Sequence, residues 1–329
     1  MRRTFLFAVA LTALAAGAGV VFLSYSNDMG RARAVVATGS RIADTAAGKI
    51  EYAEKGAGRP LLSIHGAGGG YDQGLAIAED FCGDAYHVIA PSRFGYLGAP
   101  IPVDVSPAAQ ADAHAALLAE LGIEKAIIVG VSAGARSAVE LALRHSDSVA
   151  ALILIAPGTY SPTSPVAVEA SRGSRFVFWA VNAGADFAWW TMKKLAPSVL
   201  IRFMGVPPRI VAAATREQRD RVMRLVRSIQ PLSRRFPGIN IDSHPDLHRL
   251  PLEKISAPTL VISARDDLFN TLPAAEFAAE TIPNAKLVLF ETGGHLLVEH
   301  EQETRAVIGD FLNKARLDLS IIPEIDARP

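Results

Sequence analysis

The chain has 329 residues, and its 33 lysines and arginines balance its 33 aspartates and glutamates. A formal net charge of zero argues against a nucleic-acid-binding protein, which needs a basic surface. The length suits one large domain with an insertion, or two domains, and half of the residues are hydrophobic, enough for a sizeable core. The single cysteine, Cys82, excludes an internal disulfide and a cysteine-based zinc site, and is expected to be a small buried hydrophobe.

The N-terminal segment is apolar. Residues 4–25 carry no charge, follow Arg2 and Arg3, and reach the length of about 20 apolar residues that can span a bilayer. A cleaved signal peptide is the competing interpretation, because the Ala/Gly-rich middle offers small residues for cleavage. The apolar run continues to Leu23, beyond a typical signal core, and this favours an uncleaved membrane anchor. Either way, the rest of the chain is expected on the non-cytoplasmic side, periplasmic or extracellular, anchored there or secreted after cleavage.

Strands and helices alternate after this segment. Residues 27–40 are polar and small and indicate a linker, and residues 41–54 indicate a β-hairpin. Ser106 is a good N-cap and Pro107 suits the first position of a helix, which is expected to end at residue 121. Apolar runs predict buried strands at 61–65, 87–90, 126–131 and 149–155. This alternation predicts a parallel sheet that is covered by helices on both faces.

The pattern changes between residues 160 and 250, which contain no clear strand. Apolar residues recur there at helical spacing, beside Arg216, Arg219, Arg221, Arg224 and Arg227. The segment carries fourteen Lys/Arg against six Asp/Glu, and it holds all three tryptophans, Trp179, Trp189 and Trp190. The alternation then resumes with a strand at 259–263, a helix at 273–281, a strand at 286–290 and a helix at 299–316. We therefore predict an anchor or signal at 1–26, a linker at 27–40, a core at 41–159, an insertion at 160–250, more core at 251–316 and a tail at 317–329.

Residues 126–135 predict a nucleophile elbow. A buried strand leads into the turn Gly130-Val131-Ser132-Ala133-Gly134, and a helix follows to residue 145. A strained turn that lifts a serine above the sheet needs glycine at positions 130 and 134, since a side chain there would collide with neighbouring backbone. Ser132 would lie at the helix N-terminus, where free N–H groups stabilise an anion. A serine hydroxyl also needs a base to remove its proton, and a histidine oriented by a carboxylate is expected.

The last two predicted strands supply both groups. Asp266 and Asp267 follow the strand at 259–263, and His295 follows the strand at 286–290. Functional groups of a parallel sheet gather at the carboxyl ends of its strands, so these side chains are expected near Ser132. The chain order serine, acid, histidine is that of one serine-hydrolase fold. Either aspartate could be the acid.

With these motifs the sequence resembles the α/β-hydrolase family from Arg41 to about Arg316, and residues 160–250 match in position only, as a helical cap. The matching motifs are His65-Gly66-Ala67-Gly68-Gly69, the elbow, the Asp266 segment and Gly294-His295. The resemblance implies a mostly parallel eight-stranded sheet with helices on both faces and a helical cap insertion.

The resemblance also implies roles for single residues. Ser132 would be the nucleophile, His295 the base and Asp266 the orienting acid, because the family's spacing to Leu268 favours Asp266 over Asp267. The backbone N–H groups of Ala67 and Ala133 would form the oxyanion hole. His65 would shape the oxyanion loop through hydrogen bonds, and the other motif-shaping residues would be Gly66, Gly130 and Gly134.

Three positions depart from the family's pattern, and none removes a catalytic group. Ala135 stands where a second glycine is common, Ser92 where many members have aspartate, and Asn270 where a proline often follows the acid. No metal-ligand spacing appears among the remaining histidines, so we expect neither a metal nor a cofactor. These histidines are expected to be surface or structural residues: His114, His145, His244, His248 and His300.

A serine at the elbow argues against the dehalogenase and epoxide-hydrolase members of the family, which use aspartate there. We expect a hydrolase of carboxylic esters with a small or lipid-like apolar substrate, because the cap is rich in Trp and Phe and the anchor keeps the enzyme near lipid. One alternative is a carbon–carbon bond hydrolase of the meta-cleavage type. An alternative from another class is a non-catalytic membrane-anchored binding protein on a hydrolase scaffold. The basic stretch 216–227 is a second membrane contact, a solvated face, or a set of arginines that pair with acidic residues of the core.

Overall fold

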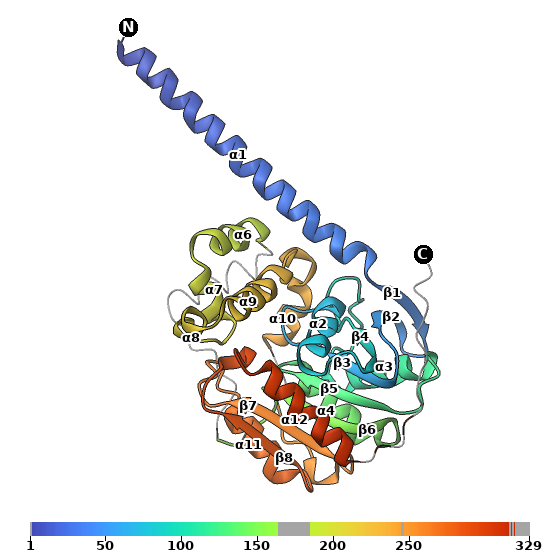
Figure 1. The fold of residues 1–329 in the computed structure, drawn as a ribbon. Helices are drawn as coiled ribbons and strands as arrows, with labels where there is room; N and C mark the ends of the chain where they lie inside the picture. The colour runs from blue at the N-terminus through green and yellow to red at the C-terminus, as the bar shows by residue number, and fades with distance from the viewer. Residues whose placement is uncertain (1, 164–184, 245–246, 316, 318, 320–329) are drawn as a thin grey trace.

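The core of the protein is an eight-stranded sheet with the order β1-β2-β4-β3-β5-β6-β7-β8 (Figure 1). The computed structural model describes residues 2–163, 185–244, 247–315, 317 and 319. β1 and β2 form the predicted hairpin, β2 is antiparallel to β4, and all other neighbours are parallel. The strands are β1 (Arg41–Thr45), β2 (Gly48–Lys55), β3 (Arg59–Ile64), β4 (Tyr86–Pro91), β5 (Ala126–Val131), β6 (Val149–Ile155), β7 (Thr259–Ala264) and β8 (Lys286–Phe290). The prediction of a mostly parallel eight-stranded sheet is confirmed.

Helices cover both faces of the sheet, as predicted. One face packs against α2 (Tyr71–Phe81) and α12 (Glu301–Lys314), through apolar residues such as Phe81 and Phe311. The other face packs against α3 (Pro107–Glu120), α4 (Gly134–Arg144) and α11 (Leu272–Thr281). The predicted cap of α3 is confirmed, because the Ser106 hydroxyl accepts the Ala109 N–H at 3.1 Å.

α2 was not predicted from the sequence. It follows the glycine-rich loop directly, its N-cap residue is Gly70, and no side chain caps its first turn. The usual polar start signal of a helix is therefore missing. The helix is stabilised by packing instead, since Tyr71, Ile77 and Phe81 are buried.

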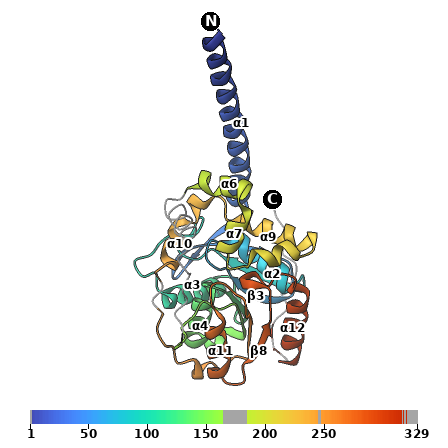
Figure 2. The same cartoon turned by 90° about the vertical axis from the view of Figure 1, so that its left-hand side faces the viewer.

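Five described α-helices lie between β6 and β7 and form the cap region. They are α6 (Asp186–Leu195), α7 (Pro197–Phe203), α8 (Pro208–Ala213), α9 (Arg216–Ser228) and α10 (Phe236–Asp242), all on the same side of the sheet domain (Figures 1 and 2). They have a small apolar core of their own around Trp189, Leu200 and Val226. Trp179 and the rest of residues 164–184 lie outside the described residues, as does most of the predicted tail at 317–329.

α1 (Arg2–Thr38) is one continuous helix that extends away from the rest of the molecule (Figures 1 and 2). Its apolar part is long enough to cross a membrane, with a mean hydropathy of 2.4 over its most apolar window. The structure differs from the irregular linker expected at 27–40, because the helix runs through to Thr38. Tertiary contacts hold this part in place: Met29 is buried, and the Tyr71 hydroxyl donates to the Val35 carbonyl at 3.2 Å.

The part of α1 around Tyr25 and Asp28 contacts α6. The ring of Tyr25 meets Phe187 and Trp190 edge-on, with centroid distances of 5.2 and 5.7 Å. The Trp190 indole N–H donates to Asp28 at 2.8 Å, and Lys194 lies 3.2 Å from the same carboxylate. Phe187 nevertheless stays 50% exposed. An aromatic cluster therefore surrounds the point where the apolar helix leaves the domain.

The basic stretch on α9 is divided between two environments. Arg216, Arg219, Arg224 and Arg227 are exposed. Arg221 is buried, lies 2.7 Å from Asp80 of α2, and donates to the Leu296 carbonyl at 3.2 Å. For Arg221 the structure therefore bears out the expectation of pairing with an acidic residue of the core, and this pair joins the cap region to the sheet domain. The spacing of Arg221 along the helix places it on the apolar face, with Val222 and Val226.

Candidate active site

Ser132 lies on the predicted sharp turn between β5 and α4. Its φ of 52° is in the left-handed region, which is unusual for a serine and typical of a strained functional turn. A Cβ at position 130 would come within 2.5 Å of the Ala138 Cβ, and a Cβ at position 134 would come within 2.6 Å of the Ile64 carbonyl oxygen. Neither position can hold a side chain without a shift of the neighbouring chain. The prediction that this turn needs both glycines agrees with these distances.

His295 is paired with Asp267, and the preference for Asp266 is corrected. The His295 Nδ1 lies 2.7 Å from the Asp267 Oδ2, and both side chains are buried. Asp266 instead accepts the Gly294 N–H through Oδ1 at 2.8 Å, and among the described residues its Oδ2 has no partner. The two aspartates are adjacent, so the bend of the chain after β7 decides which side chain points toward the histidine.

The surroundings of Asp267 keep it ionised. Burial raises the pKa of this carboxyl, but the His295 imidazole, the Thr271 hydroxyl and the Phe269 N–H outweigh burial and hold the pKa below its ordinary value. The Phe269 N–H donates to Oδ1 at 2.8 Å, while the Thr271 hydroxyl donates to Oδ2. An ionised Asp267 must accept a hydrogen from His295, so the proton on the neutral ring is at Nδ1 and Nε2 is free to accept another.

A backbone carbonyl from the cap region connects the loop after β7, which carries Asp267, with the loop after β8, which carries His295. The Gly205 oxygen accepts the Leu268 N–H at 3.0 Å and the His295 N–H at 3.1 Å. Gly205 has a φ of 78°, and a Cβ there would lie 2.6 Å from the His295 Cβ. Only glycine suits this position. Sequence reasoning missed Gly205, because no motif surrounds it and its partners are more than 60 residues away.

The loop after β3 is held in shape by His65. The backbone N–H of Arg93 donates to the His65 Nε2 at 2.9 Å, so the ring proton is at Nδ1, which lies 2.7 Å from the Gly66 carbonyl oxygen. Burial and the nearby Arg93 charge hold the pKa of His65 well below its ordinary range. With both nitrogens engaged, His65 has no free position for proton transfer. This geometry fits the predicted shaping role.

The two predicted oxyanion donors border one cavity. Ala67 and Ala133 both line it, as Ser132 and His295 do. Within the described part of the chain, the backbone N–H groups of Ala67 and Ala133 donate to no other residue. At Gly66 the loop after β3 approaches the elbow closely, since a Cβ there would be 3.2 Å from the Ser132 Cβ. These N–H groups are therefore available to an anion beside the serine.

The cavity has a volume of about 370 Å³, a size suited to a small organic molecule. Its walls come from the sheet domain and from the cap region. Most of its lining is apolar, including Ile77, Phe81, Ile155, Trp189, Phe203, Met204, Leu225, Ile229, Leu232 and Phe269. Polar side chains are fewer: Gln73, Asp80, Arg136, Arg221, Asp242, Ser243 and Thr271.

A buried ion pair ties the cap region to the oxyanion loop. Arg93 donates through both terminal nitrogens to Asp242 of α10, at 2.9 and 2.5 Å, and through Nε to the His65 carbonyl at 3.0 Å. The Tyr96 hydroxyl donates to the same carboxylate at 2.5 Å and receives the Gly68 N–H at 3.3 Å. The sequence alone does not indicate this pairing, because Arg93 and Asp242 are separated by almost half of the chain.

The departures from the family's pattern have local explanations. The Ser92 hydroxyl accepts the Tyr71 N–H at 3.0 Å, at the start of α2. Asn270 has a φ of 53° and donates its N–H to the Asp267 carbonyl at 3.0 Å, two features that proline cannot provide. Ala135 is fully buried beside Gly130, so its methyl group fits.

Three other titratable groups, His114, His145 and Cys82, do not line the large cavity. His114 is buried, and desolvation lowers its pKa to about 3. His145 pairs with Asp112 on the surface of the sheet domain. Cys82 is buried, as expected, and burial raises the pKa of its thiol to about 12. Within residues 2–163, 185–244 and 247–315, no group of three or more His, Cys, Asp or Glu is placed to hold a metal.

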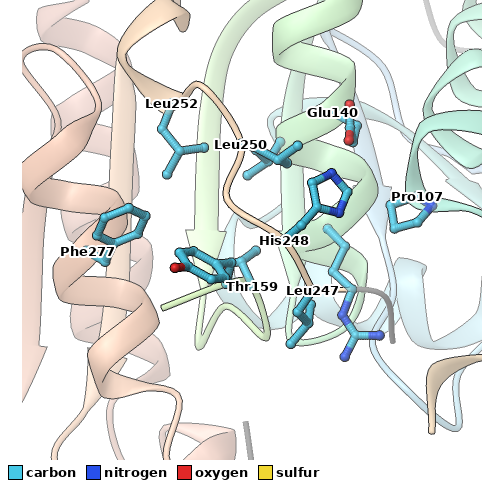
Figure 3. A pocket seen from close by; sticks show the side chains of 11 residues that line it. Pro107, Glu140, Thr159, Leu247, His248, Leu250, Leu252 and Phe277 are labelled. Atoms are coloured by element: carbon cyan, nitrogen blue, oxygen red, sulfur yellow. The ribbon is translucent and has the colours of Figure 1, made fainter. Parts of the chain in front are cut away.

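A second, small cavity lies beside α4. Its volume is about 30 Å³, close to the space of one water molecule. Figure 3 shows Glu140 and His248 on one side of it, with Leu250, Leu252 and Phe277 along its apolar wall. Arg136 lines both this cavity and the large one, so its side chain lies between them.

Comparisons with known proteins agree with the fold. Residues 59–302 match the family model of the alpha/beta hydrolase fold. The chain is 29% identical over 278 residues to a 2-hydroxymuconate semialdehyde hydrolase of Pseudomonas putida, covering 80% of this chain and 90% of that protein. It is 27% identical over 263 residues to Lipase 1 of Psychrobacter immobilis, covering 78% of each. A solved structure of a bacterial membrane phospholipase A has the same fold, with a TM-score of 0.62 at 23% identity over 96% of this chain and 99% of that one.

Proposed function

Because the chain belongs to the α/β-hydrolase fold family, we propose that it is a serine hydrolase that cleaves carboxylic esters of small or lipid-like apolar substrates. One observation carries the proposal. Ser132 and His295 line a single, largely apolar cavity, and His295 is hydrogen bonded to the buried Asp267. The nucleophile is Ser132, the base is His295, and Asp267 rather than Asp266 is the orienting acid.

The reaction proceeds in two halves. His295 takes the Ser132 proton at Nε2, because Nδ1–H is held by Asp267, and the serine oxygen attacks the ester carbonyl. The N–H groups of Ala67 and Ala133 stabilise the negative oxygen of the tetrahedral intermediate. The protonated His295 then gives its proton to the leaving alcohol, and an acyl-enzyme remains. Water, activated by His295 in the same way, hydrolyses this acyl-enzyme.

Carbon–carbon bond hydrolysis is the second candidate. The observation that favours it is the 29% identity to a 2-hydroxymuconate semialdehyde hydrolase, beside 27% identity to a lipase. Substrate profiling separates the two reactions. The proposal expects p-nitrophenyl esters and triglycerides of short acyl chains to be turned over at least 100-fold faster, as kcat/KM, than a 2-hydroxy-6-oxo-dienoate. The opposite preference would contradict ester hydrolysis and support carbon–carbon bond hydrolysis as the reaction.

We also propose that α1 anchors the protein in a membrane, with the hydrolase domain on the non-cytoplasmic side. The apolar length of α1 supports an anchor, and the aromatic cluster of Tyr25, Phe187 and Trp190 suits the interface of a bilayer, where aromatic residues gather. Secretion after signal cleavage is the alternative. N-terminal sequencing of the protein from the membrane fraction and from the soluble fraction tests this. Intact residues 4–25 support the anchor, and a start near residue 19 establishes a cleaved signal.

A further inference from the structure

Arg136 is a cavity residue that the proposed reaction does not use. It belongs to the first turn of α4, and its side chain is 12% exposed. Its Nε donates to the Gly158 carbonyl at 2.9 Å, and the Gly158 N–H in turn donates to the Ser132 carbonyl at 2.9 Å. The guanidinium group is therefore only two hydrogen bonds away from the main chain of the nucleophile.

The guanidinium of Arg136 is incompletely paired. Its Nη1 makes a long hydrogen bond of 3.4 Å to the Asp242 main-chain oxygen and lies 3.7 Å from that residue's carboxylate. Its Nη2 has no hydrogen-bond partner among the described residues. Burial lowers the pKa of Arg136, but an arginine stays charged in proteins because its ordinary value exceeds 12.

The nearest carboxylate is already neutralised by another group. Asp242 accepts two short hydrogen bonds from Arg93 and one from Tyr96. Two arginines therefore share one carboxylate, and Arg136 is the more distant of the two. The group Arg93–Asp242–Arg136 carries one excess positive charge. Burying a charge without a close partner costs free energy, which an anionic ligand would recover.

Other acidic residues near the cavity do not compensate this charge. Asp80 lies 2.7 Å from Arg221 and forms a separate neutral pair. Glu140 is one helical turn beyond Arg136, but the charges that act on it are those of Arg144, His248 and Asp112, and it forms no ion pair with Arg136 within 4 Å. The excess positive charge therefore remains at the cavity wall.

We infer that Arg136 binds an anionic group, a carboxylate or a phosphate, on an otherwise apolar ester substrate. The inference rests on the proposed ester hydrolysis and narrows its substrate class to amphiphilic anions. The apolar walls receive the hydrocarbon part, and the guanidinium receives the charged oxygens through Nη1 and Nη2. A bidentate arrangement of this kind is the preferred way for arginine to bind planar or tetrahedral oxyanions.

The main test compares two esters of equal acyl length, using the full-length protein in a neutral detergent. One is mono-p-nitrophenyl adipate, which ends in a carboxylate, and the other is its methyl ester. The measured quantity is the ratio of kcat/KM for the charged ester to that for the neutral one. Arg136→Gln should lower this ratio about 10- to 100-fold, the range of a lost hydrogen bond to a charged group. Arg136→Lys keeps the charge but lacks the paired N–H donors of the guanidinium, so its ratio should lie between those of wild type and Arg136→Gln.

A matched control lies on the same helix. Arg144→Gln removes an arginine that pairs with Asp112 outside the cavity, and it should leave the ratio at the wild-type value. A structural role of Arg136 alone would lower kcat/KM for both esters in the same proportion. An unchanged ratio in Arg136→Gln would therefore overturn the inference, whatever the loss of total activity.

A binding experiment separates this inference from the proposed reaction. In full-length Ser132→Ala protein, hexanoate or hexyl phosphate should raise the melting temperature, while hexanol and an equal concentration of sodium chloride should not. Adding Arg136→Gln should remove the shift. If anions bind in this way but no ester is hydrolysed, ester hydrolysis fails and the Arg136 site stands. If neither anion raises the melting temperature more than hexanol does, the inference is wrong. A shift with hexyl phosphate alone assigns the site to phosphate-bearing lipids, and one with hexanoate alone to carboxylic acids.

Discussion

Replacing Asp267 by asparagine should remove most of the activity, although the change is nearly isosteric. The carboxylate accepts three hydrogen bonds, from His295 and Thr271 on Oδ2 and from the Phe269 N–H on Oδ1. An amide has one acceptor oxygen, so its NH₂ group must face at least one of these donors. If it faces His295, the ring proton moves to Nε2, and the ring can no longer accept the Ser132 proton.

The expected loss in kcat/KM is about 10⁴-fold, the scale measured when the acid of a Ser-His-Asp triad becomes an amide. At about 1.4 kcal/mol per tenfold change this is about 5.5 kcal/mol of transition-state stabilisation. Asp266→Asn is the matched control. It keeps an oxygen for the Gly294 N–H and should cost less than tenfold. The assay is p-nitrophenyl ester hydrolysis with circular dichroism to confirm folding. A larger loss in Asp266→Asn than in Asp267→Asn would refute the assignment of the acid.

Three further predictions concern stability and location. First, the folded pKa of His114 is about 3, and the unfolded value is about 6.5, so the unfolded chain binds more protons between these values and stability falls as the pH drops through this window. His114→Gln should flatten this acid limb in urea unfolding between about pH 4 and 7, and an unchanged limb would contradict the assignment. Second, Gly134→Ala should lower both stability and activity because of the close Ile64 carbonyl, while Gly309→Ala on α12, where no atom lies within 4 Å, should keep both. Third, protein lacking residues 1–26 should leave the membrane fraction and keep esterase activity; retention on membranes would point to another contact, such as the exposed arginines of α9.

Local features of the site could be predicted from the sequence, because strand, turn and helix are adjacent there. The elbow at Ser132 needs small residues within five positions, and the proximity of the acid and the histidine follows from parallel strands that end at the same edge. The choice between Asp266 and Asp267 could not be made this way. It depends on the direction of two adjacent side chains, since Asp267 points to His295 and Asp266 to the Gly294 N–H.

Features that depend on contacts between residues far apart in the chain also could not be predicted from the sequence. The start of α2 has no polar cap, and the last part of α1 is held in helical form by contacts to Trp190 and Tyr71. Arg136 follows the elbow directly in the sequence. Its excess positive charge can be inferred only from the structure, which shows that Asp242 is already paired with Arg93. Long-range pairing of this kind has no pattern in a single sequence.

Covalent labelling of Ser132 tests the central claim most directly. A fluorophosphonate reacts with an activated serine and leaves a stable adduct that peptide mass spectrometry can locate. The account predicts one adduct on the peptide that contains Ser132, no adduct in Ser132→Ala, and labelling slowed by at least 100-fold in His295→Ala. An adduct on a different residue, or none on folded wild-type protein, would contradict it and favour a binding protein on a hydrolase scaffold.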